Sequence, residues 1–266
     1  MKILVVNAGG TSLKYKLFSI DRDESVLSSG KVERIGSSES LLEHKTKSGE
    51  LIKKSIGKVD YNKAVQEALN IIVSHSEGSI SSVDEISAIG FKTVHAGEKR
   101  DTAFLDKEII DEMEKFRDAA PLHNKFYIEV ITQFRALLPD TPLVGVFETS
   151  FHATIPDYAY IYSFPYEWYE NHGIRKYGFH SASFRYIVTR LPHVIEKPLR
   201  ELKIIACHLG GSSSVCAISA GKSIDTSMGF TLQAGLPMST RCGDVDPYAL
   251  LVIQEREKKS TSQLSD

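Results

Sequence analysis

The sequence has little that would suit a disulfide scaffold, a nucleic-acid groove or a membrane span. Its 266 residues include three cysteines, none in a C-x-x-C pair, so neither a disulfide framework nor a zinc knuckle is expected. Lys and Arg number 32 against 34 Asp and Glu, and this net charge of −2 gives no basic excess for nucleic acid. No apolar run approaches the roughly 18 residues that span a membrane, and the first apolar run is too short for a signal peptide. We therefore expect a cytoplasmic protein with no nucleic-acid or membrane partner.

The apolar pattern predicts a mixed α/β protein. Hydrophobic residues make up 42% and charged residues 25% of the chain, which is ordinary globular composition, and the length suits one large domain or two small ones. Buried runs and alternating segments predict strands, and apolar residues at helical spacing predict helices. The expected strands are Ile3–Asn7, Ser12–Phe18, Val26–Arg34, Ile86–His95, Pro142–Phe147, Leu202–His208 and Ser214–Ile218. The expected helices are Tyr61–Ser74, Asp106–Arg117 and Phe126–Leu138, and residues 36–57 are expected to form a loop with a weak hairpin.

One local pattern occurs twice. The stretch from Leu4 to Ser12 (LVVNAGGTS) and the stretch from Ile205 to Ser213 (IACHLGGSS) each place an apolar strand before Gly-Gly and then hydroxyl residues. Each is followed by an outgoing strand, so the chain is expected to hold two copies of one unit. The first copy extends to about Phe147, whereas few residues follow the start of the second, which predicts an incomplete second copy and hence a fragment or truncated form.

The two Gly-Gly turns are candidate phosphate sites. Glycines allow close backbone approach, successive N–H groups can form an anion-binding nest, and Ser or Thr hydroxyls add donors. Tight hairpin turns without a ligand are the alternative. The segment Gly221-Lys222-Ser223 looks like the end of a Walker loop, but it lacks the upstream glycine and is expected in a hairpin.

Further polar motifs lie along the chain, and they combine His, Arg or carboxylates with Gly, Pro or aromatic residues. They are Val94-His95 with Gly97-Glu98, Ala120-Pro121-Leu122-His123-Asn124, Phe151-His152 with Pro156, Tyr177-Gly178-Phe179-His180, His208-Leu209-Gly210, Asp225-Thr226-Ser227-Met228-Gly229-Phe230 and Gly243-Asp244 with Asp246-Pro247. Together with the first turn and its Ser12-Leu13-Lys14-Tyr15, these motifs resemble the acetokinase family, within the sugar kinase–Hsp70–actin superfamily.

The resemblance implies a duplicated two-domain α/β fold of the actin-like ATPase (ribonuclease H-like) type around a cleft, with an incomplete second domain. The expected domains are residues 1–149 and 150–266. It also implies a homodimer, for which the aromatic-rich stretch 158–169 is a candidate interface.

The reaction implied is reversible phosphoryl transfer from Mg-ATP to acetate, giving acetyl phosphate and ADP, with ATP and Mg²⁺ as cofactors. The implied catalytic residues are His123, Glu148, His180 and Arg241. The implied substrate-binding residues are Lys92, Val94, Leu122 and Phe179, of which the last three would line a pocket for the acetate methyl group. The implied nucleotide- and phosphate-binding residues are Asn7, Ser12, Lys14, His208, Gly210, Gly211 and Ser212, and Asn7 would also help to place the metal.

The chain departs from the family pattern near the chemistry. The family has Arg where this chain has Lys92, and Asp where it has Glu148. Further departures are Gly10, Gly211, Leu232 and the pair Ser183-Phe184, where the family has Ser, Asn, Pro and Ser-His. Two alternatives therefore stay open: a catalytically weak or inactive paralogue that binds phosphate, nucleotide or a partner, and a propionate or butyrate kinase.

Overall fold

The computed structural model describes residues 1–21, 24–76, 78–97, 102–117 and 121–265 and divides into two compact units, Met1–Ala153 and Thr154–Asp266. Side chains of residues 121–123 and 265 lie outside the described part. The strands of unit 1 are β1 (Lys2–Gly9), β2 (Ser12–Ile20), β3 (Glu24–Glu33), β4 (Leu41–Lys45), β5 (Leu51–Ser55), β6 (Ala88–Thr93), β7 (Ala103–Phe104) and β8 (Leu143–Phe147). Its helices are α1 (Tyr61–Ile72), α2 (Lys107–Lys115) and α3 (Pro121–Leu137), with a short 3₁₀ helix η1 (Val83–Glu85); a second, η3 (Ser150–Thr154), lies at the junction of the units.

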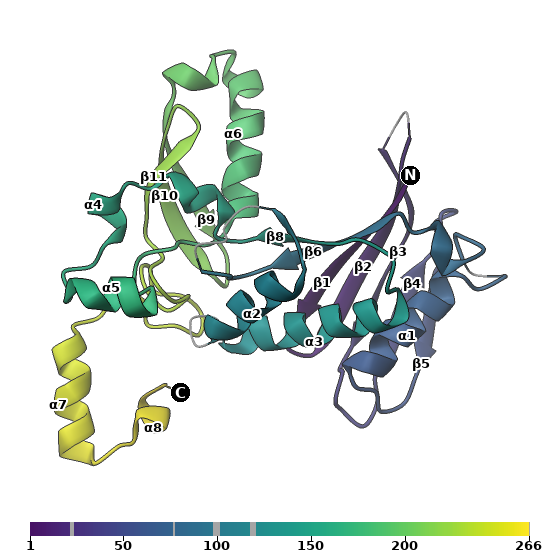
Figure 1. Ribbon diagram of the computed structural model, residues 1–266, viewed down its shortest axis with the longest axis horizontal. Helices are drawn as coiled ribbons and strands as arrows, with labels where there is room; N and C mark the ends of the chain where they lie inside the picture. Colours follow the sequence, from purple (N-terminus) through teal and green to yellow (C-terminus); the bar gives the residue numbers. More distant parts are fainter. Residues whose placement is uncertain (22–23, 77, 98–101, 118–120, 266) are drawn as a thin grey trace. The chain divides into compact units, whose positions relative to one another are not determined.

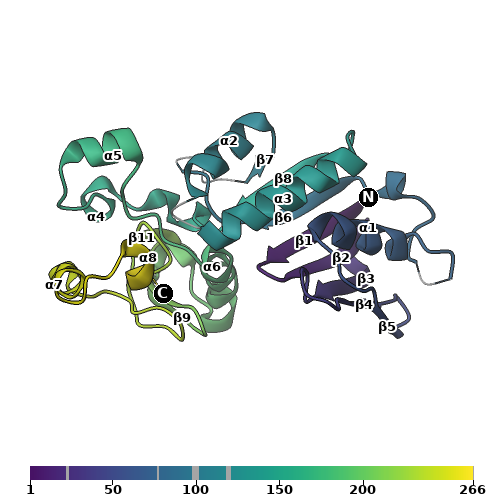
Figure 2. The ribbon, with the colours of Figure 1, turned by 90° about the horizontal axis from the view of Figure 1, so that it is seen from below.

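One sheet, in the order β5-β4-β3-β2-β1-β6-β8-β7, organises unit 1. Strands β1 to β5 pair antiparallel in sequence order, whereas β6 pairs parallel with β1 and β8 parallel with β6. The inner order β3-β2-β1-β6-β8 is that of ribonuclease H-like domains, as expected for the actin-like ATPase fold. Helices α1 and α3 pack side by side against one face of this sheet (Figure 1 and Figure 2).

Alternation of side chains decides which face the helices cover. Leu4, Val6, Leu13 and Leu17 point to the helix-covered face and are buried, and the residues between them along each strand are mostly exposed. Helix α1 packs against this face with buried residues at spacings of three and four. The Asp60 side chain caps the helix by accepting a hydrogen bond from the backbone N–H of Lys63. The core of unit 1 therefore lies between the two helices and this face.

A glycine in β3 makes room for a tyrosine on the covered face. Tyr15, Gly30 and His44 are cross-strand neighbours on β2, β3 and β4. The Tyr15 ring lies over Gly30, and its hydroxyl reaches His44 Nδ1 at 2.8 Å. A Cβ at Gly30 would stand 2.3 Å from the Tyr15 hydroxyl oxygen, so only glycine fits there.

Unit 2 has a smaller sheet in the order β11-β10-β9, formed by β9 (Lys203–Leu209), β10 (Ser213–Ser219) and β11 (Lys222–Thr226), all antiparallel. Its helices are α4 (Asp157–Tyr160), α5 (Tyr166–His172), α6 (Ser181–Ile195), α7 (Pro247–Glu257) and α8 (Thr261–Ser265), with the 3₁₀ helix η4 (Leu199–Glu201). Ala220 and Gly221, both with positive φ, form the two-residue loop between β10 and β11. The segment Gly221-Lys222-Ser223 therefore lies in a hairpin, as predicted.

The recurrence seen in the sequence is a recurrence of fold, because β1-β2-β3 and β9-β10-β11 are both antiparallel meanders. The loops differ by one residue: Gly9 pairs with Ser12, whereas Leu209 pairs with Ser213. In strand register, His208 therefore matches Ala8 rather than Asn7, which corrects the pairing that the sequence suggests. This one-residue difference turns the His208 side chain toward α6.

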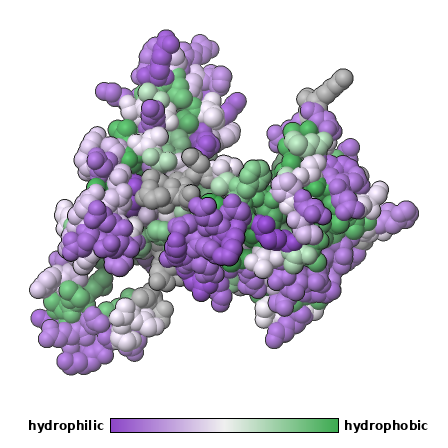
Figure 3. Space-filling view, in the orientation of Figure 1, coloured by the Kyte–Doolittle hydropathy of each residue, from purple (hydrophilic) through white to green (hydrophobic). Residues whose placement is uncertain are grey.

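Apolar side chains are also exposed on α7. Leu250, Leu251 and Ile253 are at least 39% exposed, and Figure 3 shows green over α7; Tyr248 is exposed as well. Among the described residues, no helix combines the length and the apolar character needed to cross a membrane.

Candidate functional site

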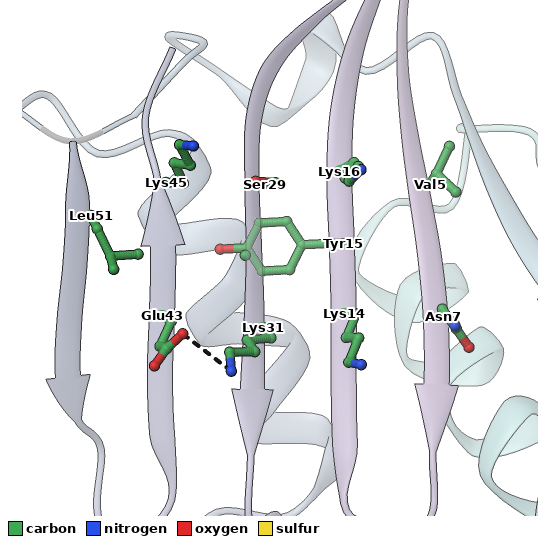
Figure 4. A pocket seen from close by; sticks show the side chains of 11 residues that line it. Val5, Asn7, Lys14, Tyr15, Lys16, Ser29, Lys31, Glu43, Lys45 and Leu51 are labelled. Atoms are coloured by element: carbon green, nitrogen blue, oxygen red, sulfur yellow. Dashed lines mark ion pairs between the residues drawn. The ribbon is translucent and has the colours of Figure 1, made fainter. Parts of the chain in front are cut away.

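The sequence-predicted residues of unit 1 lie at two places, and the first is the face of the sheet opposite the helices. Asn7, Lys14, Lys31 and Glu43 are successive cross-strand neighbours on four strands, so their side chains form one polar row. Figure 4 shows this row and the ion pair between Lys31 and Glu43, which measures 3.2 Å from Nζ to Oε2. A cavity of about 540 Å³ lies over the row. Its lining also includes Lys16 and Lys45, so positive charge dominates, and the groove suits anionic groups.

Two tyrosines fix the strand end beside this groove. Tyr127, on α3, donates its hydroxyl hydrogen to Asn7 Oδ1 at 2.6 Å, and Tyr61, on α1, donates to the carbonyl oxygen of Gly9. Burial raises the pKa of Tyr127 above its usual range and that of Tyr61 to about 12, so both remain donors at neutral pH. Ser12 faces Gly9 across the hairpin. The structure therefore brings Asn7, Ser12 and Lys14 together.

The Asn7 amide oxygen is the group on β1 that fits a magnesium ligand. Mg²⁺ prefers oxygen donors and commonly keeps water and substrate phosphates among its ligands, so a single protein oxygen suits it. Nowhere in the described ranges do three His, Cys, Asp or Glu side chains gather in a metal-binding group. The Asn7 amide oxygen can offer Mg²⁺ one ligand, with phosphates and water as the others.

The second place is the carboxyl ends of the parallel strands β6 and β8. Lys92 Nζ and Glu148 Oε1 are 3.7 Å apart; the lysine side chain is 50% exposed and the glutamate 10%. The backbone N–H of Glu148 donates to the carbonyl of Thr93, and Val94 next to it is buried. The side chains of Leu122 and His123 lie outside the described residues.

The sequence-predicted residues of unit 2 form a single cluster at the start of α6. His180 Nδ1 and Ser214 Oγ are 2.8 Å apart, and so are His208 Nδ1 and Ser183 Oγ. The two imidazole rings stack with centroids 4.0 Å apart and planes 16° from parallel. His180 has a φ of 63°, a left-handed conformation that few residues other than glycine adopt, and the buried Phe179 precedes it.

Arg241 belongs to the same cluster. Its guanidinium donates to Ser212 Oγ at 2.9 Å and to the carbonyl of Leu232 at 3.3 Å, and partial burial lowers its pKa from the usual value, although an Arg stays charged at neutral pH. The Gly210–Ser212 turn is further fixed by Ser239, whose hydroxyl donates to the Gly211 carbonyl at 2.9 Å. Arg241 and His208 thus both lie at the glycine turn, and His180 stacks on His208, an arrangement suited to an anionic phosphoryl group.

Sequence reasoning did not single out Ser183 or Ser214 as site residues. Ser183 contacts His208, which lies 25 residues further along the chain, so no local spacing signals this contact. Ser214 has no local signal either, because only the sheet brings β10 next to α6.

Several residues of the sequence motifs support the fold instead. The Asn124 amide donates to the backbone carbonyls of His95 and Met113. Asp244 accepts from the backbone N–H of Gly235, and Asp246 caps α7.

The strand order and the cluster define a mixed α/β protein of the actin-like ATPase class whose polar groups suit phosphate. The sequence model of the acetokinase family matches residues 2–266, and the chain belongs to that family. The predictions of family and fold class are thereby confirmed.

Individual proteins named as acetate kinases match nearly the whole of this chain. The chain is 49% identical to an acetate kinase of Clostridium botulinum strain Okra over 97% of this chain and 65% of the relative, and 45% identical to that of Thermoanaerobacter pseudethanolicus over 100% and 66%. Among solved structures, an acetate kinase of Porphyromonas gingivalis matches 99% of this chain and 66% of its own, with TM-score 0.86 and 36% identity. A propionate kinase of Francisella tularensis matches the same shares with TM-score 0.89 and 31% identity. The chain thus spans just under two thirds of the length of these relatives.

Proposed function

We propose that this protein carries out the reversible transfer of a phosphoryl group between Mg-ATP and acetate, with acetyl phosphate and ADP as products. Family membership supports the reaction class. The observation that carries the proposal is the cluster of His180, His208, Arg241 and the Gly210–Ser212 turn, because phosphoryl transfer needs positive charge and donors around the equatorial oxygens.

The residues of this cluster have distinct proposed roles. Arg241 and His180 stabilise the charge on the phosphoryl group in flight, and the family pattern gives His123, outside this cluster, a catalytic role as well. His208, Gly210, Gly211 and Ser212 bind phosphate oxygens. The acetate carboxylate is already an anionic nucleophile and needs no general base, so positioning and electrostatics supply the catalysis.

Unit 1 contributes nucleotide and substrate residues to the proposal. Asn7, Ser12 and Lys14 bind the phosphates, and the Asn7 amide oxygen would help to hold the magnesium. When bound, magnesium neutralises charge on the transferring phosphates. Lys92 and Glu148 bind the polar end of the substrate, and Val94 and Leu122 are substrate-binding residues of the same unit. In unit 2, Phe179 is the further substrate-binding residue that the family pattern implies.

The choice of acid is part of the proposal. A pocket for one methyl group discriminates against a further methylene by only about 1–3 kcal/mol. The likeness to a propionate kinase structure is a reason to test propionate and butyrate beside acetate.

Trapping the acyl phosphate as its hydroxamate tests the activity directly. We expect Mg²⁺- and ATP-dependent product from acetate, and a decrease in kcat of about 10²- to 10³-fold in Arg241→Ala. Arg200→Ala is the matched control, because the Arg200 side chain is 83% exposed and lies in η4. Turnover that is equal in wild type and Arg241→Ala would contradict the assignment. ATP binding without turnover would instead support the inactive-paralogue alternative.

A homodimer is the proposed assembly. The stretch 158–169 exposes Tyr158, Phe164, Tyr166 and Trp168, at 86%, 55%, 54% and 42%, and aromatic residues of this kind are enriched in interfaces. Sedimentation of wild type and of a Tyr158→Ser/Trp168→Ser variant tests it, and a monomeric wild type at micromolar concentration would refute it.

A further inference from the structure

The stacked histidines of unit 2 are each fixed by a serine, through the same ring atom. Ser214, on β10, contacts His180, and Ser183, on α6, contacts His208, and both contacts reach Nδ1. A hydroxyl can donate to an unprotonated Nδ1 or accept from a protonated one. The direction decides which ring nitrogen of each histidine carries the hydrogen.

Burial decides the direction at Ser214. Its side chain is fully buried, and across the described part of the chain its hydroxyl contacts no polar group other than His180 Nδ1. If Nδ1 carried the hydrogen, the hydroxyl hydrogen of Ser214 would be left without an acceptor in a buried place, which is unfavourable. Donation from Ser214 to Nδ1 satisfies both groups and puts the His180 hydrogen on Nε2.

The stack favours the same arrangement for His208. Two positively charged rings with centroids 4.0 Å apart would repel each other strongly, so the close stack disfavours the doubly charged pair. With His180 neutral, the Arg241 cation at the same turn favours a neutral His208 as well. With Ser183 donating to its Nδ1, a neutral His208 also carries its hydrogen on Nε2. That atom lies beside the turn, 4.0 Å from the place where a Cβ of Gly210 would stand.

We propose that Ser214 and Ser183 are positioning residues that hold His180 and His208 as neutral imidazoles with the hydrogen on Nε2, ready to donate to phosphoryl oxygens. Arg241 then supplies the positive charge of the cluster, and the two histidines supply directed N–H donors. The catalytic part of this inference rests on the proposed phosphoryl transfer, whereas the state of the rings does not.

Nitrogen NMR of the histidine rings tests the ring states without any turnover. The chain is labelled with ¹⁵N-histidine, and long-range ¹H–¹⁵N spectra at neutral pH report the tautomer, with His180→Gln and His208→Gln assigning the signals. We expect both rings to carry hydrogen on Nε2. In Ser214→Ala, His180 becomes a mixture of tautomers and His208 does not change; Ser183→Ala gives the converse. Ser214→Thr keeps the hydroxyl and the wild-type spectrum, and Ser219→Ala, on the same strand, is the matched control.

Three spectroscopic results would overturn the inference: a wild-type His180 with its hydrogen on Nδ1, two positively charged rings, or a His180 signal that Ser214→Ala leaves unchanged. Circular dichroism checks the fold of each variant. If Ser214→Ala does not fold, Ser214→Cys carries the same test, because a thiol of similar size is a weak donor.

Kinetics then test the positioning role. Ser214→Ala is expected to lower kcat by about 10- to 100-fold with little change in the KM for acetate, and Ser214→Thr is expected to restore it. A loss that Ser214→Thr fails to restore refutes the positioning role. A wild type without turnover refutes the proposed function, and the ring states are still decided by the spectra.

Discussion

The ion pair between Lys92 and Glu148 joins two positions at which the chain departs from the family pattern. A shorter acid in place of Glu148 would withdraw the carboxylate by more than an ångström from an Nζ–Oε1 distance that is already 3.7 Å. The longer, forked guanidinium of an arginine at position 92 can bridge that gap. The two departures from the family pattern are therefore expected to compensate each other.

A double-mutant cycle measures this compensation. Glu148→Asp is expected to lose the pair, and Lys92→Arg in the same chain to recover it, with a coupling of about 0.5–1 kcal/mol in the free energy of urea unfolding, because the lysine is half exposed. The exposed helical pair Lys107–Asp111 serves as a control with a smaller coupling. Strictly additive effects at positions 92 and 148 would show that the residues do not act as a pair.

The three cysteines are expected to differ in reactivity because they differ in burial. Cys216 is fully buried on β10, and burial raises the pKa of its thiol to about 11, so about one molecule in a thousand carries the thiolate at pH 8. Cys207 and Cys242 are exposed. We expect iodoacetamide at pH 8 to modify Cys207 and Cys242 within minutes and to spare Cys216 until urea unfolds the protein, as peptide mass spectrometry can show. Equal rates for all three thiols in the folded protein would contradict this burial.

At the scale of elements, the row Tyr15–Gly30–His44 is a point where one strand tolerates no side chain. A Cβ at position 30 would collide with the Tyr15 ring and with the carbonyl oxygen of Glu43 at 2.6 Å. Gly30→Ala is therefore expected to lower the free energy of unfolding by about 1–3 kcal/mol, measured from urea midpoints. Gly90→Ala on β6 is the matched control, because its Cβ would meet nothing within 4 Å. A Gly30→Ala variant as stable as this control would show that the neighbouring strands shift enough to accommodate the added methyl group.

The elements with a strong local pattern were predictable, and those that tertiary contacts decide were not. The expected strands match β1, β2, β3, β6, β8, β9 and β10 in place, because buried runs and alternation are local signals. Helix α6 was not predicted: it begins at Ser181, after an N-cap His180 whose left-handed backbone no local pattern indicates. Helix α7 was also not predicted, since it buries none of its residues and so lacks an apolar stripe. Helix α3 begins five residues before the predicted start, at Pro121, a residue that suits the first turn of a helix.

The residues of the candidate site also divide into those that local sequence patterns indicate and those that only tertiary contacts bring together. Glycine turns and isolated His and Arg residues could be read from the sequence, but the serines that hold the imidazoles come from strands and helices far apart along the chain. The register of the second turn, which carries His208 toward α6, depends on one extra loop residue that sequence comparison of the two copies does not show.

At the scale of the whole molecule, buried tyrosines couple folding to alkaline pH. Burial raises the pKa of Tyr15, Tyr127 and Tyr162 above the usual value and that of Tyr61 to about 12. Unfolded tyrosines lose their protons near pH 10, whereas the folded protein keeps these hydroxyls protonated to higher pH. The unfolded state then binds fewer protons than the folded state, so stability declines as pH rises.

The stabilisation from Tyr61 is complete below pH 10 and is lost as pH rises from 10 toward 12. We expect the urea midpoint to be level from pH 8 to 9 and to decrease steadily above pH 10. The share of the tyrosinate absorbance that comes from the buried tyrosines should appear only as the protein unfolds. Tyr61→Phe lacks the ionisable hydroxyl and should show a shallower decline, even though it loses the hydrogen bond to the Gly9 carbonyl and starts less stable. A urea midpoint that stays level to pH 11.5, or a Tyr61→Phe slope equal to that of wild type, would mean that these hydroxyls ionise in the folded protein. The contacts that fix the first glycine turn would then be weaker than the structure indicates.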